Sequence, residues 1–308
     1  MYENKGYTVY EKRVLSSNKK NELVGKIYKP FGDIKGYFHI VHGMTEHIER
    51  YDAFMTELVK NGYLVFGYDN LGHGKTAKDD SELGFIASSN GDDILAHDVK
   101  VFSDAVIAEF GNHPYYLMGH SMGSFIVRMA TQKYVTPTKL IIMGTSGPNP
   151  IAGAGLIMCK LLKAIKGERY VSSLIETLAF GTYNSHFENE NDPRSWLTND
   201  IDIRRKYDND KFCTFKFTVV AMHDLISLNL DSNKDVWFKE VAKKMPILLV
   251  SGKDDPVGDY GKGVILCEEK LKLNGANVTT KIYPNNRHEI LNDNCRIQAT
   301  QDILDFIK

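Results

Sequence analysis

Short, nearly continuous apolar runs alternate with helix-length amphipathic segments along most of this 308-residue chain. Strands covered by helices on both faces carry such runs, whereas half-exposed strands alternate apolar with polar residues. A helix is predicted at 92–110, where apolar residues recur at three- to five-residue steps, and another at 49–60, which ends at the stop signal Asn61-Gly62. We predict strands at 36–42, 63–69, 115–119, 139–144, 246–251 and 278–283. The pattern is typical of an α/β fold, with a doubly wound, mostly parallel central sheet and helices on both faces.

Two features depart from this regular alternation. Two earlier β-like runs, at 7–14 and 22–28, are expected to form an antiparallel edge of the sheet. Between about 147 and 240 the alternation stops, although a crossover between parallel strands needs only about a dozen residues. We therefore predict an α/β core formed by residues 1–146 and 241–308, and an inserted, mostly helical cap at 147–240.

Composition excludes several classes of protein. Thirty-eight basic residues balance thirty-nine acidic ones, so neither nucleic acid nor an anionic membrane is expected as the main partner. Neither a signal peptide nor an 18-residue apolar span is predicted. The four cysteines are far apart and form no Cys-x-x-Cys pair, which favours free thiols over a metal site. We expect a cytoplasmic protein without a bound metal.

One motif points to chemistry. Gly119-His120-Ser121-Met122-Gly123 fits Gly-x-Ser-x-Gly, and it lies between a predicted strand and a helix predicted from Ser121 to about Tyr134. That setting is the one a nucleophile elbow requires. Side chains at Gly119 and Gly123 would collide in so sharp a turn. The turn presents the Ser121 hydroxyl above the sheet at a helix N-terminus, so we predict Ser121 as a nucleophile.

A serine nucleophile needs a base and an acid that orients the base. Two carboxylates, Asp254 and Asp255, follow the strand 246–251, and His288 follows the strand 278–283. Both positions are at the sheet edge where the carboxyl ends of parallel strands gather. No other histidine follows the candidate acid. We predict His288 as the base and Asp255 as the orienting acid, with Asp254 as the alternative acid.

An oxyanion hole needs two backbone donors. One is the N–H of Met122, directly after the serine. The other is expected in the loop after strand 36–42, where Gly43 allows close approach of the backbone and Met44 supplies the N–H. His42 and Glu46 either brace this loop or are ordinary polar loop residues, and the sequence does not decide between the two.

Taken together, these motifs resemble those of the α/β-hydrolases of the monoacylglycerol lipase and lysophospholipase group. The resemblance implies the α/β-hydrolase fold, a lid made from the insert, and no cofactor. It also implies a nucleophile, acid and base at Ser121, Asp255 and His288. The likeness lies in His42-Gly43-x-x-Glu46-His47-x-x-Arg50-Tyr51, Asp69-x-x-Gly72-His73-Gly74, Gly119-His120-Ser121-Met122-Gly123, Gly252-x-x-Asp255-Pro256-Val257 and Arg287-His288-Glu289.

We hypothesise a serine hydrolase that cleaves esters of single-chain lipids, such as a monoacylglycerol or a lysophospholipid, through an acyl-enzyme. The strongly apolar stretch 151–165 in the insert suits an acyl chain. It either faces lipid, as a surface-lying helix with peripheral membrane contact, or packs over the active site.

Two alternatives stay open at this stage. A proline-iminopeptidase-like enzyme on the same fold would need a cap carboxylate to bind a free amine, and Glu188, Glu190 and Asp192 are candidates. From a different class, the chain could be a non-catalytic ligand receptor on this scaffold. The sequence leaves the oligomeric state open.

Overall fold

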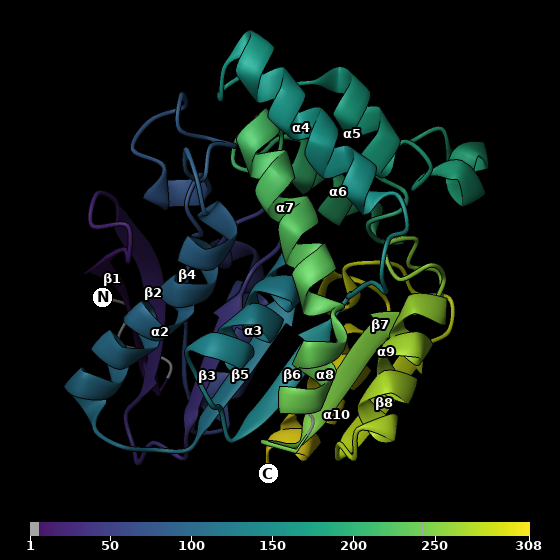
Figure 1. Cartoon of the computed structure of the whole chain (residues 1–308). Helices are drawn as coiled ribbons and strands as arrows, with labels where there is room; N and C mark the ends of the chain where they lie inside the picture. Colours follow the sequence, from purple (N-terminus) through teal and green to yellow (C-terminus); the bar gives the residue numbers. More distant parts are fainter. Residues whose placement is uncertain (1–5, 242) are drawn as a thin grey trace.

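The computed structural model describes residues 6–241 and 243–308 and contains one eight-stranded sheet (Figure 1). Its strands stand in the order β1-β2-β4-β3-β5-β6-β7-β8. Every predicted strand forms, with ends within two residues of the prediction. The strands are β1 (Tyr7–Leu15), β2 (Glu22–Pro30), β3 (Tyr37–Val41), β4 (Leu64–Tyr68), β5 (Tyr115–His120), β6 (Lys139–Met143), β7 (Ile247–Gly252) and β8 (Val278–Tyr283).

Strand pairing follows the predicted pattern. β1 pairs antiparallel with β2, and β2 antiparallel with β4, whereas the pairs from β4 through β8 are parallel. All residues of β3, β4, β5 and β7 are buried. β8 alternates partly buried with exposed residues, because it is the edge strand and only one of its sides meets another strand. The expected antiparallel edge and parallel centre are confirmed.

Helices cover both faces of the sheet. α2 (Gly91–Phe110), α3 (Met122–Lys133) and α9 (Lys262–Leu273) pack in one apolar cluster with inward side chains such as Phe66 and Leu117. The opposite cluster contains α1 (Asp52–Lys60) and α10 (Arg296–Ile307) with side chains such as Val65 and Met118. Alternate residues of one strand therefore face different helix layers. Three short 3-10 helices lie in core loops: η1 (Ile48–Tyr51), η2 (Gly74–Thr76) and η4 (Ile290–Asn292).

The segment between β6 and β7 is helical, and its upper part lies over one end of the sheet (Figure 1). The last helix, α8 (Asp235–Val241), packs against α3 and α9, which both belong to the core. We propose that the cap ends before α8, ahead of the predicted boundary at residue 240. The elements are α4 (Ala152–Lys166), α5 (Ser173–Phe180), η3 (Ser185–Glu190), α6 (Ile201–Asp208), α7 (Val219–Ser232) and α8 (Asp235–Val241).

An exposed apolar surface covers α4 and α5. One side of α4 buries Ala152 and Cys159 and packs on α7. The other side leaves large apolar residues in solvent, up to Ile165 at 73% exposure. We call this surface the apolar cap face; it comprises Ile151, Ile157, Leu161, Ile165, Leu174 and Leu178. Among the described residues, none of the helices combines the length and apolarity needed to cross a bilayer.

Candidate active site

The serine lies in a strained turn between β5 and α3. Ser121 has φ 54° and ψ −123°, a conformation that residues other than glycine rarely adopt. A side chain at Gly119 would collide with the carbonyl oxygen of Gly123, and one at Gly123 would collide with that of Val41. The two glycines are therefore required by the turn, and the strand–turn–helix context expected around the serine is present.

The candidate base and acid are hydrogen-bonded to each other. His288 Nδ1 lies 2.9 Å from Asp255 Oδ2, and both residues are buried. The second carboxylate oxygen, Asp255 Oδ1, accepts the N–H of Val257 at 2.8 Å. Asp254 is only partly buried, and its side chain forms no hydrogen bond within the described ranges. Because the carboxylate can only accept, Nδ1 carries the proton and Nε2 is left as the basic nitrogen.

His288 lies beside the serine turn. The ring of His120, the residue before Ser121, is 4.7 Å from the His288 ring between centroids, and His120 Nε2 lies 3.3 Å from the His288 carbonyl oxygen. The hydrogen bonds of residues 6–241 and 243–308 do not include one between Ser121 Oγ and His288 Nε2. Catalytic hydrogen bonds of free enzymes often form only when substrate binds. The structure thus brings acid and base into contact and places His288 beside the residue that precedes the nucleophile.

Two backbone amides next to Ser121 are available to an anion. Met122 is the first residue of α3, so its N–H has no acceptor within the helix. Met44 follows β3, and within the described part of the chain neither amide donates a hydrogen bond. A Cβ at Gly43 would lie 2.8 Å from Ser121 Cβ, so only glycine lets this loop approach the serine so closely. The arrangement suits an oxyanion hole.

His42 and Glu46 hold the loop that carries Met44. Glu46 Oε1 accepts the Gly43 N–H at 2.5 Å. His42 donates from Nδ1 to the Gly43 carbonyl at 2.8 Å, while its Nε2 accepts the Asn70 N–H at 2.9 Å. Burial lowers the pKa of His42 and keeps it neutral, as an accepting nitrogen requires. Of the two interpretations left open by the sequence, bracing is the one that these bonds support.

Sequence reasoning missed a buried charged network below the site. Glu46 also accepts from His120 Nδ1 at 3.0 Å and from the Tyr51 hydroxyl at 3.0 Å. Arg50 contacts Glu46 at 3.2 Å and binds both carboxylate oxygens of Glu289 at 2.6 Å. Burial acts to lower the pKa of His120, but the hydrogen bond and charge of Glu46 outweigh it and raise that pKa. The signal was present in the motifs, where Arg50 and Glu289 had no stated role and Glu46 was considered only as a brace of the loop after β3.

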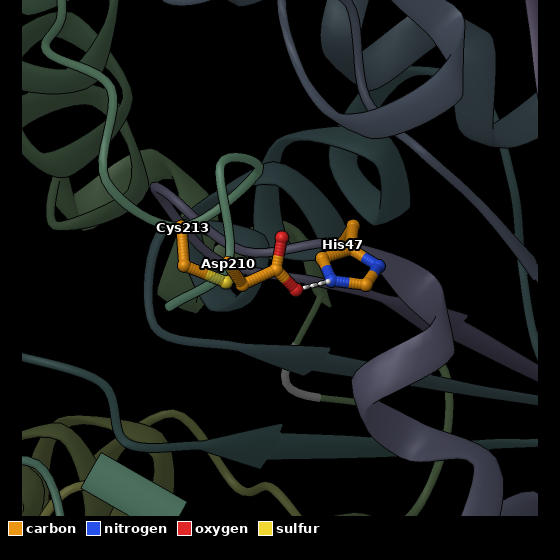
Figure 2. Close-up of side chains that lie close together, drawn as sticks. All are labelled: His47, Asp210 and Cys213. Carbon is orange, nitrogen blue, oxygen red and sulfur yellow. Dashed lines mark hydrogen bonds and ion pairs between the residues drawn. The ribbon is translucent and has the colours of Figure 1, made fainter. Parts of the chain in front are cut away.

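One cluster has the donor types of a metal site. His47, Asp210 and Cys213 place a nitrogen, an oxygen and a sulfur within 4.8 Å of one another (Figure 2), the sole such group in the described residues. His47 Nε2 is already bonded to Asp210 Oδ2 at 2.8 Å. Burial raises the pKa of the Cys213 thiol, whereas a metal ligand must be a thiolate. We therefore infer that this cluster has a structural role and connects the loop after β3 with the segment between α6 and α7. All four cysteines are unpaired.

A mostly parallel sheet with a serine on a strained strand-to-helix turn defines an α/β-hydrolase. Residues 32–295 match the model of the family Hydrolase_4, described as "Serine aminopeptidase, S33", and the chain belongs to that family of hydrolases.

Three comparisons place the chain within this fold. It is 31% identical over 104 residues to a monoglyceride lipase of Mus musculus, a match that covers 34% of this chain and about a third (32%) of that relative. It is 22% identical over 288 residues to a monoacylglycerol lipase of Mycolicibacterium smegmatis, covering 92% of each. Among solved structures, a highly thermostable carboxyl esterase from Bacillus coagulans is similar at a TM-score of 0.91, with 30% identity over 97% of this chain and 98% of the other.

Proposed function

We propose that this protein is a serine hydrolase that cleaves carboxylic esters of single-chain lipids, a monoacylglycerol or a lysophospholipid. One observation carries the proposal: the buried His288–Asp255 hydrogen bond lies beside the strained Ser121 turn. The free amides of Met44 and Met122 add a place for the negative charge that develops in acyl transfer. These parts support a serine hydrolase, and they argue against a purely ligand-binding protein.

The chemistry follows from the arrangement. Ser121 Oγ attacks the ester carbonyl while His288 Nε2 takes its proton, and the carbonyl oxygen becomes an oxyanion between the two amides. Asp255 holds Nδ1–H and stabilises the imidazolium that forms. His288 then gives the proton to the leaving alcohol, which leaves an acyl group on Ser121. Water, activated by His288, attacks this acyl-enzyme and releases the fatty acid.

The choice of lipid ester rests on the inserted helices, which we propose as a cap (lid). The Trp196 ring is 5.3 Å from the His288 ring, and Tyr183 is 5.1 Å from Trp196, between centroids. The cap therefore adds an aromatic wall next to the base, suited to an apolar substrate. The names of the mouse and mycobacterial relatives support a monoacylglycerol in particular.

Aminopeptidase activity is the second candidate, because the family description names it. It would require a cap carboxylate free to bind an amine. Glu190 is instead paired with Arg287 and with Arg204, and Asp192 is paired with Arg204 at 3.0 Å. Glu188 is exposed to solvent. None of the three carboxylates considered from the sequence is thus both enclosed and unpaired, which favours the ester hydrolase.

A substrate panel tests the proposed function. Monoacylglycerols, lysophospholipids and p-nitrophenyl esters of increasing chain length are compared with proline and alanine anilides. We expect kcat/KM for the best ester to exceed that for any anilide by at least about 100-fold, since none of the three cap carboxylates considered is placed to bind a free amine. Faster turnover of an amino-acyl anilide would reverse the ranking of the two functions.

We further propose that the apolar cap face contacts a lipid surface. Exposed apolar patches of this kind mark interaction sites. Ile157→Asp with Leu161→Asp is expected to weaken co-sedimentation with neutral phosphatidylcholine vesicles about tenfold or more. Hydrolysis of soluble p-nitrophenyl acetate should stay unchanged. Ile297→Asp, at an 81% exposed position on α10, is the matched control and should bind as the unmodified protein does.

A further inference from the structure

The residue directly before the candidate base is held by the cap. Arg287 is buried, and its guanidinium binds both carboxylate oxygens of Glu190 and the backbone carbonyl of Ser195. It also stacks over the Phe187 ring, 4.0 Å from the ring centroid. Phe187 and Glu190 belong to η3, between α5 and α6. Each of these contacts to the guanidinium thus comes from the insert.

The same part of the insert continues past the other side of His288. The Glu289 N–H donates to the Leu197 carbonyl at 2.8 Å, and Thr198 Oγ1 donates to the Asn292 carbonyl at 2.8 Å. Asn199 donates from its backbone N–H to Asp293 at 3.1 Å. We call residues 187–199 the cap strap. It holds the loop of His288 both before and after the base, while Trp196 lies beside the imidazole itself.

Glu190 is itself held in place, which makes it a suitable anchor. Arg204 of α6 binds Glu190 Oε2 at 2.8 Å and Ser195 Oγ at 2.8 Å. The hydrogen bond from Arg287 is the main reason why the pKa of Glu190 is lowered to about 2, against the opposing effect of burial. The carboxylate therefore remains charged throughout the pH range in which a histidine can act as a base. A bidentate arginine–carboxylate pair fixes orientation as well as distance.

We propose that Glu190 and Arg287 are positioning residues, through which the cap strap sets the orientation of His288. The inference rests on the proposed function, because it gives the cap a role in the chemical step as well as in substrate binding. His288 must face Asp255 and Ser121 at once, and small displacements from this geometry lower the rate of the chemical step. The Asp255 contact comes from the core, whereas the Arg287 side chain before His288 and the Glu289 backbone after it are tied to the cap. Displacement of the cap therefore disturbs the base.

The test compares Glu190→Gln with two matched controls. Glu188→Gln changes an exposed carboxylate on the same 3-10 helix, and Glu176→Gln removes an ion pair of α5, with Lys216 at 2.7 Å, that involves neither Arg204 nor Arg287. For p-nitrophenyl acetate, too small to depend on cap contacts, we expect Glu190→Gln to lower kcat about tenfold with KM within about twofold. Labelling by a fluorophosphonate should slow by the same factor. Both controls should match the unmodified protein in rate and in melting temperature.

A spectroscopic measurement separates positioning from a purely structural role. The Nδ1 proton of His288, bonded to Asp255, should give a far-downfield proton NMR signal in the unmodified protein and in both controls. In Glu190→Gln we expect this signal to broaden or shift.

If Glu190→Gln is poorly folded, Arg287→Lys serves instead, because lysine keeps the charge but cannot form the bidentate pair. Rates and a downfield signal unchanged from the controls would overturn the proposal. An unmodified protein that shows the signal but resists the fluorophosphonate would contradict the proposed function instead.

Discussion

Ser121→Ala is expected to lower ester hydrolysis by about 10⁴-fold or more, because loss of the nucleophile removes the acyl-enzyme route altogether. The residual rate would come from the oxyanion hole and from substrate binding. The measurement is initial-rate hydrolysis of a medium-chain p-nitrophenyl ester, together with labelling by a fluorophosphonate. Labelling should disappear completely in this variant.

Ser124→Ala is the matched control for that experiment. Ser124 lies one turn further along α3, is buried, and its hydroxyl has no partner among the described residues. Its removal should leave both rate and labelling within about twofold of the unmodified protein. Persistent labelling of Ser121→Ala would place the nucleophile elsewhere.

Asp255→Asn is expected to reduce kcat by about 10⁴-fold with little change in KM. An amide in place of the carboxylate can donate to Nδ1, which favours the wrong imidazole tautomer and leaves Nε2 protonated. It also removes the charge that stabilises the imidazolium. Asp254→Asn, at the rival position, should stay within about threefold of the unmodified protein, since the Asp254 side chain forms no hydrogen bond with His288. A larger loss in Asp254→Asn than in Asp255→Asn would show that the acid is assigned to the wrong carboxylate.

The strands could be predicted because each carries its own local signal. β3 to β7 are enclosed by neighbouring strands and by helices on both faces, so their sequences are apolar almost throughout. Ser121, Asp255 and His288 each follow such a strand, and the geometry of parallel sheets brings the carboxyl ends of strands to one edge. Positions far apart in sequence could therefore be assigned to one site without any knowledge of the loops between them.

The contacts of the insert could not be predicted in this way. The Arg287–Glu190 pair joins residues 97 positions apart, and no periodic pattern links a cap loop to the loop of the base. The same is true of Glu46, whose charge is balanced by His120 and Arg50 from two different elements. α8 shows a related difficulty, because nearly all of it lies within the predicted insert, yet it packs with α3 and α9. Such contacts depend on tertiary packing, and only the folded chain reveals them.

A structure of the protein after reaction with a long-chain alkyl fluorophosphonate tests the central claim most directly. We expect phosphorus bonded to Ser121 Oγ and its oxygen within hydrogen-bond distance of the Met44 and Met122 amides, with the alkyl chain under the inserted helices. His288 should retain its bond to Asp255 and direct Nε2 towards Oγ. Phosphorus on any other residue, or an imidazole turned away from Ser121 in the adduct, would contradict this account.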